Sequence, residues 1–155
     1  VDDRESWSHV PFRALMAGVS DDLRRFEEMA DQGLYLTARR VIKPGECSHV
    51  ALFGLVRHPE LSHAESDAHW RDVHAPLALT HHAAMTFYTQ LSVLRTFKGP
   101  EIDGFALCGF GSLEDLRERF FNDDASRAVI NADVAKFADT SASPRRLIAE
   151  PETFS

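Results

Sequence analysis

The sequence predicts an α+β protein built on one antiparallel sheet, with residues 47–155 arranged in the ferredoxin-like order β-α-β-β-α-β. Three observations predict this class. Strand-length runs rich in apolar and β-branched residues alternate with two longer segments of helical period. Turn-forming sequences such as "KPGE" and "KGPEIDG" end two of these runs. The chain of 155 residues, 44% hydrophobic and 26% charged, fits one globular domain with a substantial core.

Residues 1–46 are predicted to form an N-terminal arm that precedes this domain. Within the arm, residues 20–30 have the period of a short amphipathic helix, which Ser20 caps, and residues 34–42 read as a strand. The arm ends in "ARRVIKPGE", which resembles "PRRLIAEPE" near the other end of the chain. Unless this match is chance, the arm is the remnant of a preceding half-repeat.

The elements of the domain follow in order, each with a local signal. Strands are predicted at residues 47–59, 86–97, 105–111 and 143–154, and helices at residues 62–82, 112–121 and 124–141. Ser62 with Glu65 and Ser112 with Asp115 have the spacing of a capping box, which marks where two of these helices begin. Both helices of this unit are expected on one face of the sheet, so the other, apolar face is expected to be covered by a second copy of the unit, through dimerisation or an internal duplication.

Composition and charge argue against several classes of function. A net charge of −7 disfavours nucleic-acid binding, which needs a concentrated basic patch. The sequence has no run of 18 apolar residues and no segment of signal-peptide type, so we expect no membrane span and a cytoplasmic location. Cys47 and Cys108 are too few for a disulfide framework, and free thiols in a reducing compartment are expected.

Histidine is concentrated in one region of the chain, because six of the eight lie between residues 58 and 82. A metal site on a helix needs two ligands three or four residues apart on one face. His69 and His74 are five residues apart, which turns the second side chain about 140° around the helix, and His74 and His81 lie roughly 10 Å apart along its axis. The spacing therefore predicts no metal ion.

One face of the helix at residues 62–82 is predicted to be buried. Its members, at spacings of four, three and four residues, are Trp70, His74, Leu77 and His81. The side chains expected to point outward include His69, Asp72 and His82. An inward imidazole beside an indole is either a packed histidine bonded to a backbone carbonyl or a proton-transfer group at the edge of an apolar cavity. His81, one turn further on, would line the mouth of such a cavity.

Pro76 bears on this choice because it follows His74 by two residues. A proline inside a helix leaves the carbonyl four residues earlier, that of Asp72, without its partner and kinks the helix. The distortion would fall next to His74. It indicates either a simple restart of the helix at Pro76 or an opening of the helix beside a pocket.

Four further side chains are candidates for substrate binding, and all lie on predicted strands. Tyr88 and Gln90 are two residues apart and share one face of their strand, where they could orient a carbonyl or a phenol above a ring walled by Trp70. A core or interface position explains either residue equally well. His49 and Arg57 share one face of the strand at 47–59 and could bind an anionic group.

Several stretches together resemble the EthD family of dimeric α+β-barrel proteins. They are "HWRDVHAPLA", "YTQLSV", "DGFALCGFGSLEDLRERF" and "DVAKFAD", in this order and spacing. The resemblance covers residues 47–154, and its most specific part is W-x-x-x-H-A-P-L, which begins at Trp70. The chain departs from the family pattern at Leu91, where Asn is frequent, and at Cys108-Gly109, where a bulkier pair is usual. Both changes would make a cavity roomier or more apolar.

The resemblance implies a ferredoxin-like subunit that pairs sheet to sheet into a homodimeric barrel and needs no cofactor. It implies that His74 carries out acid/base chemistry. Members of the family include decarboxylases, dehydratases and cyclases. We therefore expect a cofactor-independent lyase acting on a small aromatic or polyketide-like molecule. Two alternatives stay open: a cofactor-free monooxygenase of the same fold, and a non-catalytic binding or accessory protein of a degradation pathway.

Overall fold

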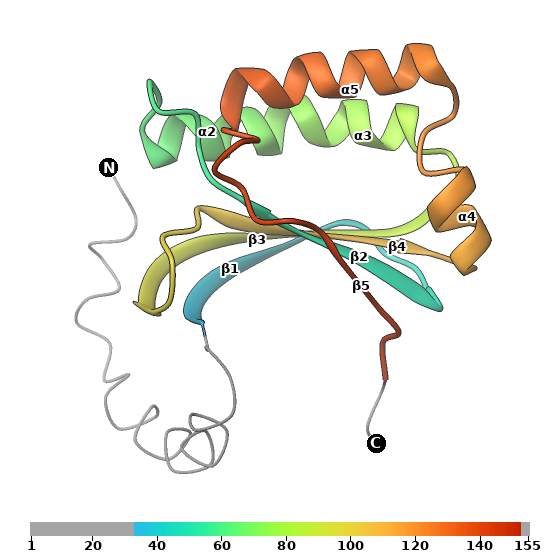
Figure 1. Ribbon diagram of the computed structural model, residues 1–155, viewed down its shortest axis with the longest axis horizontal. Helices are drawn as coiled ribbons and strands as arrows, with labels where there is room; N and C mark the ends of the chain where they lie inside the picture. Colours follow the sequence, from blue (N-terminus) through green and yellow to red (C-terminus); the bar gives the residue numbers. More distant parts are fainter. Residues whose placement is uncertain (1–32, 153–155) are drawn as a thin grey trace.

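The computed structural model describes residues 33–152, which form one sheet with helices packed on one of its faces (Figure 1). The strands are β1 (Leu34–Lys43), β2 (His49–Leu55), β3 (Met85–Lys98), β4 (Gly104–Phe110) and β5 (Leu147–Ala149). The helices are α2 (His63–His69), the π-helical turn η2 (Trp70–His74), α3 (Ala75–His81), α4 (Leu113–Glu118) and α5 (Asp124–Phe137). The helix predicted at residues 20–30 lies outside the described residues.

The sheet has five strands in the order β1-β3-β4-β2-β5, and every neighbouring pair is antiparallel. From β2 onward the elements follow β-α-β-β-α-β, so the predicted α+β, ferredoxin-like class is confirmed. The strand predicted in the N-terminal arm is β1, and it pairs along most of its length with β3. It therefore extends the expected four-stranded sheet by one edge strand.

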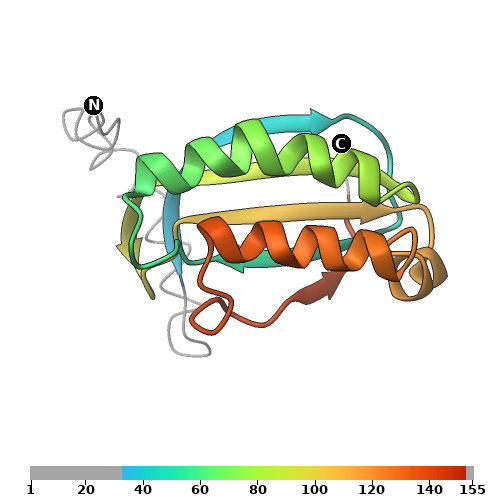
Figure 2. The same ribbon diagram turned by 90° about the horizontal axis from the view of Figure 1, so that it is seen from above.

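The helices lie in two antiparallel rows above the sheet, with α2 to α3 in one row and α5 in the other (Figure 2). The capping box at the start of α2 is confirmed: Ser62 Oγ accepts from the backbone N–H of Glu65, whose carboxylate accepts from the N–H of Ser62. At α4 only half of the box forms. Ser112 Oγ accepts from the N–H of Asp115, but the Asp115 carboxylate accepts from Arg119 instead.

The C-terminal elements are shorter than predicted, for identifiable reasons. Helix α5 ends at Phe137, not at 141, because Ala138 turns to extended backbone and forms a bridge with Arg57 beside the end of β2. Strand β5 has only three residues, which lie between Pro144 and Pro151. Proline donates no hydrogen bond to a sheet, and this limits the strand on both sides.

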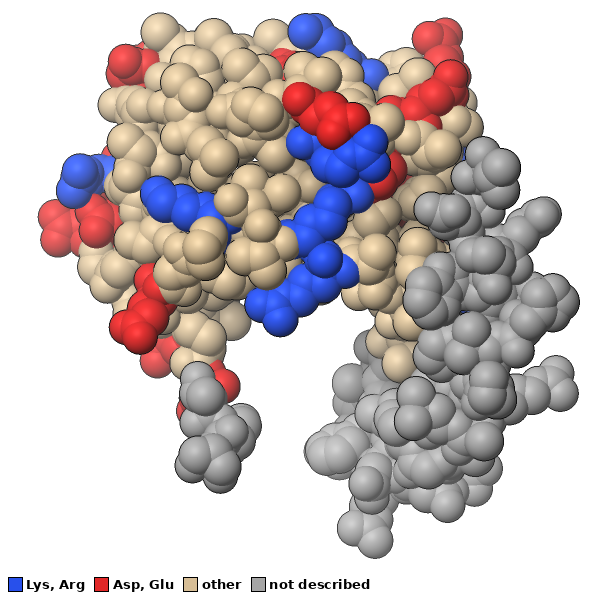
Figure 3. All heavy atoms as spheres, turned by 180° about the vertical axis from the view of Figure 1, so that it is seen from behind, with Lys and Arg blue, Asp and Glu red and all other residues tan. Residues whose placement is uncertain are grey.

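The surface seen from behind, on the side of β1, carries a short diagonal band of basic side chains with acidic side chains beside it (Figure 3). Among the described residues, an exposed ion pair joins Arg71 to Asp72, at 2.7 Å. No extended basic field forms on this face. Among the described residues, no helix is long and apolar enough to cross a membrane.

Candidate functional site

The long helical segment above the sheet changes its winding in the middle. Between α2 and α3, residues Trp70–His74 form a π-helical turn in which the N–H of Ala75 donates to the carbonyl of Trp70, five residues back. The helix continues through Pro76 with ordinary helical backbone on both sides. The wider turn lies where the proline ring would otherwise press on the carbonyl of Asp72. The predicted distortion next to His74 therefore takes the form of a π turn.

This turn changes which side chains face the interior. A π turn adds one residue to the helix, so the buried face beyond it moves on by one position. One buried row consists of Ser66, Trp70, His74, Ala78 and His82, spaced by four throughout, and Ala75 is buried beside it. The inward direction of Trp70 and His74 is confirmed. The prediction that His82 points outward is wrong, because only 4% of this residue is exposed, while His81 and Leu77 are half-buried.

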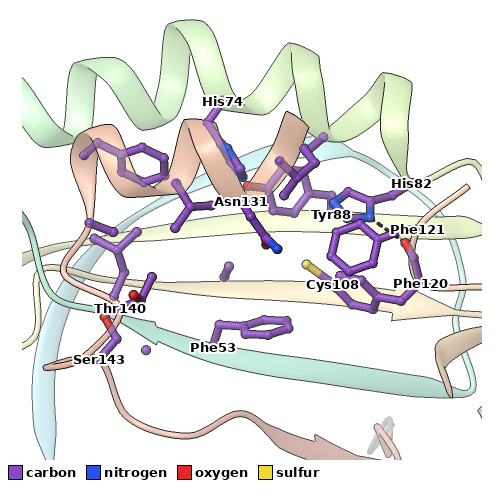
Figure 4. A pocket seen from close by; sticks show the side chains of 18 of the residues that line it. Phe53, His74, His82, Tyr88, Cys108, Phe120, Phe121, Asn131, Thr140 and Ser143 are labelled. Atoms are coloured by element: carbon purple, nitrogen blue, oxygen red, sulfur yellow. Dashed lines mark hydrogen bonds between the residues drawn. The ribbon is translucent and has the colours of Figure 1, made fainter. Parts of the chain in front are cut away.

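A cavity of about 390 Å³ lies between the helices and the sheet (Figure 4). Its walls are mostly apolar and include the rings of Phe53, Phe120, Phe121 and Phe137. The polar side chains on its lining are His74, His82, Tyr88, Cys108, Asn131, Thr140, Ser143 and Arg145. Ligand sites of this size and character, apolar with a few polar groups, are typical of small-molecule binding.

His74 is held against a buried carboxylate. Its Nδ1 lies 3.0 Å from Oδ2 of Asp133, and Nε2 of His69 lies 2.9 Å from Oδ1 of the same aspartate. A carboxylate can only accept, so both imidazoles carry hydrogen on the nitrogen that faces it. Nε2 of His74 has no hydrogen-bond partner among the described residues, and it is the nitrogen left for a bound ligand.

Burial and the contact with Asp133 act on the pKa of His74 in opposite directions. Burial lowers the pKa of His74, and the hydrogen bond from its Nδ1 to Asp133 offsets part of that effect. Burial alone would raise the pKa of Asp133, but the hydrogen bonds from His69 and His74 hold it below its ordinary value. A neutral imidazole beside an ionised carboxylate can take up a proton and have the resulting charge stabilised.

Asp133 was not predicted as a site residue. It lies 59 positions beyond His74, so no local spacing could connect the two. The available signal was an acidic residue on the inner face of a helix: Asp133 follows Ile130 and precedes Phe137 at helical spacing, and all three are buried. A buried carboxylate needs a hydrogen-bond partner. A histidine predicted to face inward from another helix, such as His74, could have been identified as that partner.

Tyr88 lines the cavity, and its hydroxyl oxygen accepts hydrogen bonds from two neighbouring side chains. Nε1 of Trp70 donates to it at 3.2 Å, and Nε2 of Gln90 donates at 3.0 Å. Gln90 is itself oriented, because its Oε1 accepts from Nε of Arg40 and its Nε2 also donates to the carbonyl of Trp70. Burial raises the pKa of Tyr88 far above its ordinary value, so the phenol stays protonated.

The consequence is that the hydroxyl hydrogen of Tyr88 stays available to a ligand in the cavity. Two donors occupy both lone pairs of the Tyr88 oxygen, and its hydrogen is then free to donate elsewhere. Trp70 and Gln90, predicted as substrate-binding residues, are brought together with Tyr88, but neither lines the cavity. Both residues instead hold the Tyr88 hydroxyl in place through their hydrogen bonds.

Three other candidates lie apart from the cavity. His81 contacts the hydroxyl of Ser126 through Nδ1, at 3.0 Å. His49 is the first residue of β2, with Nδ1 at 2.9 Å from Ser48 Oγ and Nε2 at 3.4 Å from a carboxylate oxygen of Glu150. Arg57 donates to the carboxylate of Asp103 from its backbone N–H at 2.9 Å and from Nη1 at 3.0 Å.

A second polar cluster resembles a hydrolytic triad only in its residue types. Oγ of Ser92 lies 3.5 Å from Nε2 of His63, whose Nδ1 lies 2.8 Å from Oδ1 of Asp103. Ser92 is buried, and none of the three residues lines the cavity. The cluster ties α2 to β3 and to the segment before β4. Within residues 33–152, no group of three or more His, Cys, Asp or Glu side chains is arranged to hold a metal ion.

Comparison with known proteins supports one assignment. A family model described as the EthD domain matches residues 58–141, which include the whole helical segment, β3, β4 and α5. A search of curated proteins and a search of solved structures gave no match. The matched stretch is more than half of the chain and contains His74, His82, Tyr88 and Asp133. The chain belongs to the EthD family.

Proposed function

We propose that this chain is a cofactor-independent lyase of the decarboxylase, dehydratase or cyclase type, acting on a small aromatic or polyketide-like molecule. The observation that carries the proposal is the His74–Asp133 pair at the wall of a largely apolar cavity. An imidazole with one nitrogen fixed by a carboxylate and the other unpartnered is the arrangement that general acid/base catalysis requires. The apolar walls and four phenylalanine rings suit a flat, unsaturated substrate.

Tyr88 supplies the second element of this chemistry. Proton removal next to a carbonyl, or loss of CO₂ from a β-keto acid, leaves negative charge on an oxygen. A fixed donor inside an apolar cavity stabilises that oxygen more in the transition state than in the ground state. The Tyr88 hydroxyl is such a donor, because Trp70 and Gln90 fix its orientation before the ligand arrives.

The decarboxylation of a β-keto acid illustrates how the groups would work together. The substrate binds as a carboxylic acid and transfers its carboxyl proton to Nε2 of His74, while Asp133 stabilises the imidazolium. The bond between the carboxyl carbon and the substrate carbon then breaks, CO₂ leaves, and the electron pair stays on the substrate, with its charge on the oxygen bound by Tyr88. His74 finally returns the proton to carbon, so the imidazole ends neutral.

The test is an anaerobic assay of hydroxylated aromatic carboxylic acids and β-keto acids, with loss of CO₂ or of water followed by mass spectrometry. Once a substrate is found, His74→Asn is expected to lower kcat by about 10²- to 10⁴-fold with its circular dichroism unchanged. His81→Asn is the matched control, because His81 lies outside the cavity. Full activity of the His74 variant would show that His74 is not the catalyst.

Asp133 is expected to act as a positioning residue, and pH separates this role from a purely structural one. For a dehydration or a cyclisation, which begins with proton removal by neutral His74, the rate should fall on the acid side as His74 becomes protonated, below the ordinary pKa of imidazole because burial lowers it. Asp133→Asn removes the carboxylate that favours the charged form, so the acid limb should move to lower pH as kcat falls. Asp124→Asn, an exposed carboxylate on the same helix, should leave the profile in place.

The same assay distinguishes the two alternatives. A monooxygenase would turn over only with oxygen, and its product would gain an oxygen atom. A binding protein would show ligand affinity without turnover, and His74→Asn would leave that affinity nearly unchanged.

A further inference from the structure

The far end of the cavity holds a second histidine with the same kind of arrangement as His74. His82 lies two turns of helix beyond His74, roughly 12 Å along the axis by the rise of an α-helix. His82 is only 4% exposed, and its Nδ1 contacts the backbone carbonyl of Phe120. The ring packs edge-to-face against Phe120, at 4.9 Å between centroids, and tilted against Phe121, at 5.0 Å.

The contact with Phe120 fixes the tautomer of His82. A carbonyl oxygen only accepts, so the hydrogen of the neutral imidazole lies on Nδ1 and the lone pair lies on Nε2. Burial lowers the pKa of His82, and the Phe120 carbonyl offsets only part of this. Within the described part of the chain no group donates to Nε2, although His82 lines the cavity (Figure 4). The cavity therefore offers a fixed acceptor at this end.

The chemistry of a ligand for this end follows from the neighbouring groups. The surrounding surface is aromatic, with Phe53 and Phe110 packed against Phe120 at centroid distances of 5.7 and 5.4 Å. Cys108 contributes a thiol whose pKa burial raises to about 12, so it brings no charge. An uncharged acceptor between aromatic rings suits a hydroxyl on an aromatic ring, not a carboxylate, which has no hydrogen to donate.

We infer that His82 determines specificity by accepting, through Nε2, a hydrogen bond from a hydroxyl group of an aromatic ligand. The inference rests on the cavity being the ligand site of the proposed function, but not on any turnover. It makes the ligand a phenol held at two places: a hydroxyl hydrogen at His82, and an oxygen or acidic group near Tyr88 and His74. A histidine that is merely packed would gain nothing from the ligand hydroxyl.

The test compares 2-naphthol with 2-methoxynaphthalene, an ether of similar shape that cannot donate a hydrogen bond. Binding to the full chain is measured by calorimetry or by ligand fluorescence. Wild type should bind 2-naphthol about tenfold more tightly, the value of one hydrogen bond. His82→Asn should remove this preference, because the shorter amide can still donate to the Phe120 carbonyl but lacks Nε2. Affinity for the ether should stay within about twofold.

Two controls give every outcome a meaning. His81→Asn, the neighbouring residue outside the cavity, should retain the preference for 2-naphthol. Histidine side-chain ¹⁵N spectra should show the Nε2 resonance of His82 shifting with 2-naphthol and not with the ether. The inference is overturned if wild type binds the two probes equally or binds neither, or if the preference survives His82→Asn or disappears only with His74→Asn. Failure of the lyase proposal would leave the binding result unchanged, so the two failures are distinguishable.

Discussion

At the scale of single residues, hydrogen-bond partners determine which histidines can serve a ligand. Among the described histidines only His74 and His82 line the cavity, and each has its Nδ1 occupied by an acceptor of the protein. His63 and His69 contact carboxylates from outside the cavity, at Asp103 and Asp133. The cluster around Asp133 includes His74, which lines the cavity, whereas the cluster of His63 and Asp103 lies outside the cavity. We therefore expect the cluster around Asp103 to stabilise the fold.

Asp103 is expected to stabilise the fold in a pH-dependent way. Its side chain is 8% exposed and accepts from His63 and from the backbone and side chain of Arg57. Burial alone would raise its pKa, but these hydrogen bonds hold it well below the ordinary value for a carboxyl group. A lowered folded-state pKa adds stability that is fully present above the unfolded-state pKa, near about 4, and is lost as the pH falls toward the folded-state value.

Asp103→Asn should therefore cost about 2 kcal/mol at pH 7, the usual size for hydrogen bonds to a buried charge. The difference from wild type should shrink between about pH 5 and pH 2, as the unfolded wild-type chain becomes protonated. Urea unfolding at several pH values measures both effects. Asp124→Asn is the control, because 97% of its side chain is exposed. A penalty independent of pH would show that packing, not charge, makes Asp103 important.

At the scale of elements, local signals predicted most of the fold, and the failures have physical causes. Hydrophobic period and turn residues predicted all four strands after residue 46, and Ser62 correctly marked the start of α2. The sequence could not show that β1 pairs with β3, since pairing partners far apart leave no local pattern. His82 was misplaced because a period of 3.6 residues was assumed through a π turn. Asp133 was missed because its partner is 59 residues away.

The contact between η2 and β4 gives a prediction at this scale. Gly104 begins β4 directly beneath Trp70, and a Cβ there would lie 2.5 Å from Cζ3 of the indole and 3.1 Å from the carbonyl oxygen of Leu91. Gly104→Ala must therefore move an indole that is buried and bonded to Tyr88, at a cost of about 1–3 kcal/mol. Urea unfolding measures the loss, and affinity for 2-naphthol reports the effect on the cavity.

Gly111→Ala is the matched control for Gly104→Ala. A Cβ at Gly111 meets no atom within 4 Å, and its backbone needs no left-handed conformation. This variant should match wild type within about 0.5 kcal/mol, as surface substitutions do. Equal stability of the two variants would mean that the indole has room to move, and that Tyr88 is held less firmly than its hydrogen bonds indicate.

At the scale of the whole molecule, the sheet has one face covered by helices and one face that no described helix covers (Figure 1). Paired positions trace a row across all five strands on this second face: Val41, Thr89, Leu107, Leu52 and Leu147. Four of the five are aliphatic. The two edge members are open to solvent, with Val41 48% and Leu147 64% exposed. An apolar row of this length is typical of a surface that binds another protein.

We propose that a second copy of the chain covers this face, sheet against sheet, so that the protein is a homodimer. Sedimentation velocity should then show a mass of about twice the 17.4 kDa of one chain.

Leu147→Glu should weaken the dimer at least about tenfold, because it places a charge in an apolar interface. The fold of each copy should persist, since Leu147 is already exposed within one chain. Leu79→Glu, 42% exposed on α3 on the helix side, should leave the dimer intact. A wild-type protein that sediments as a monomer at high concentration would contradict the proposal, and so would equal weakening by both variants.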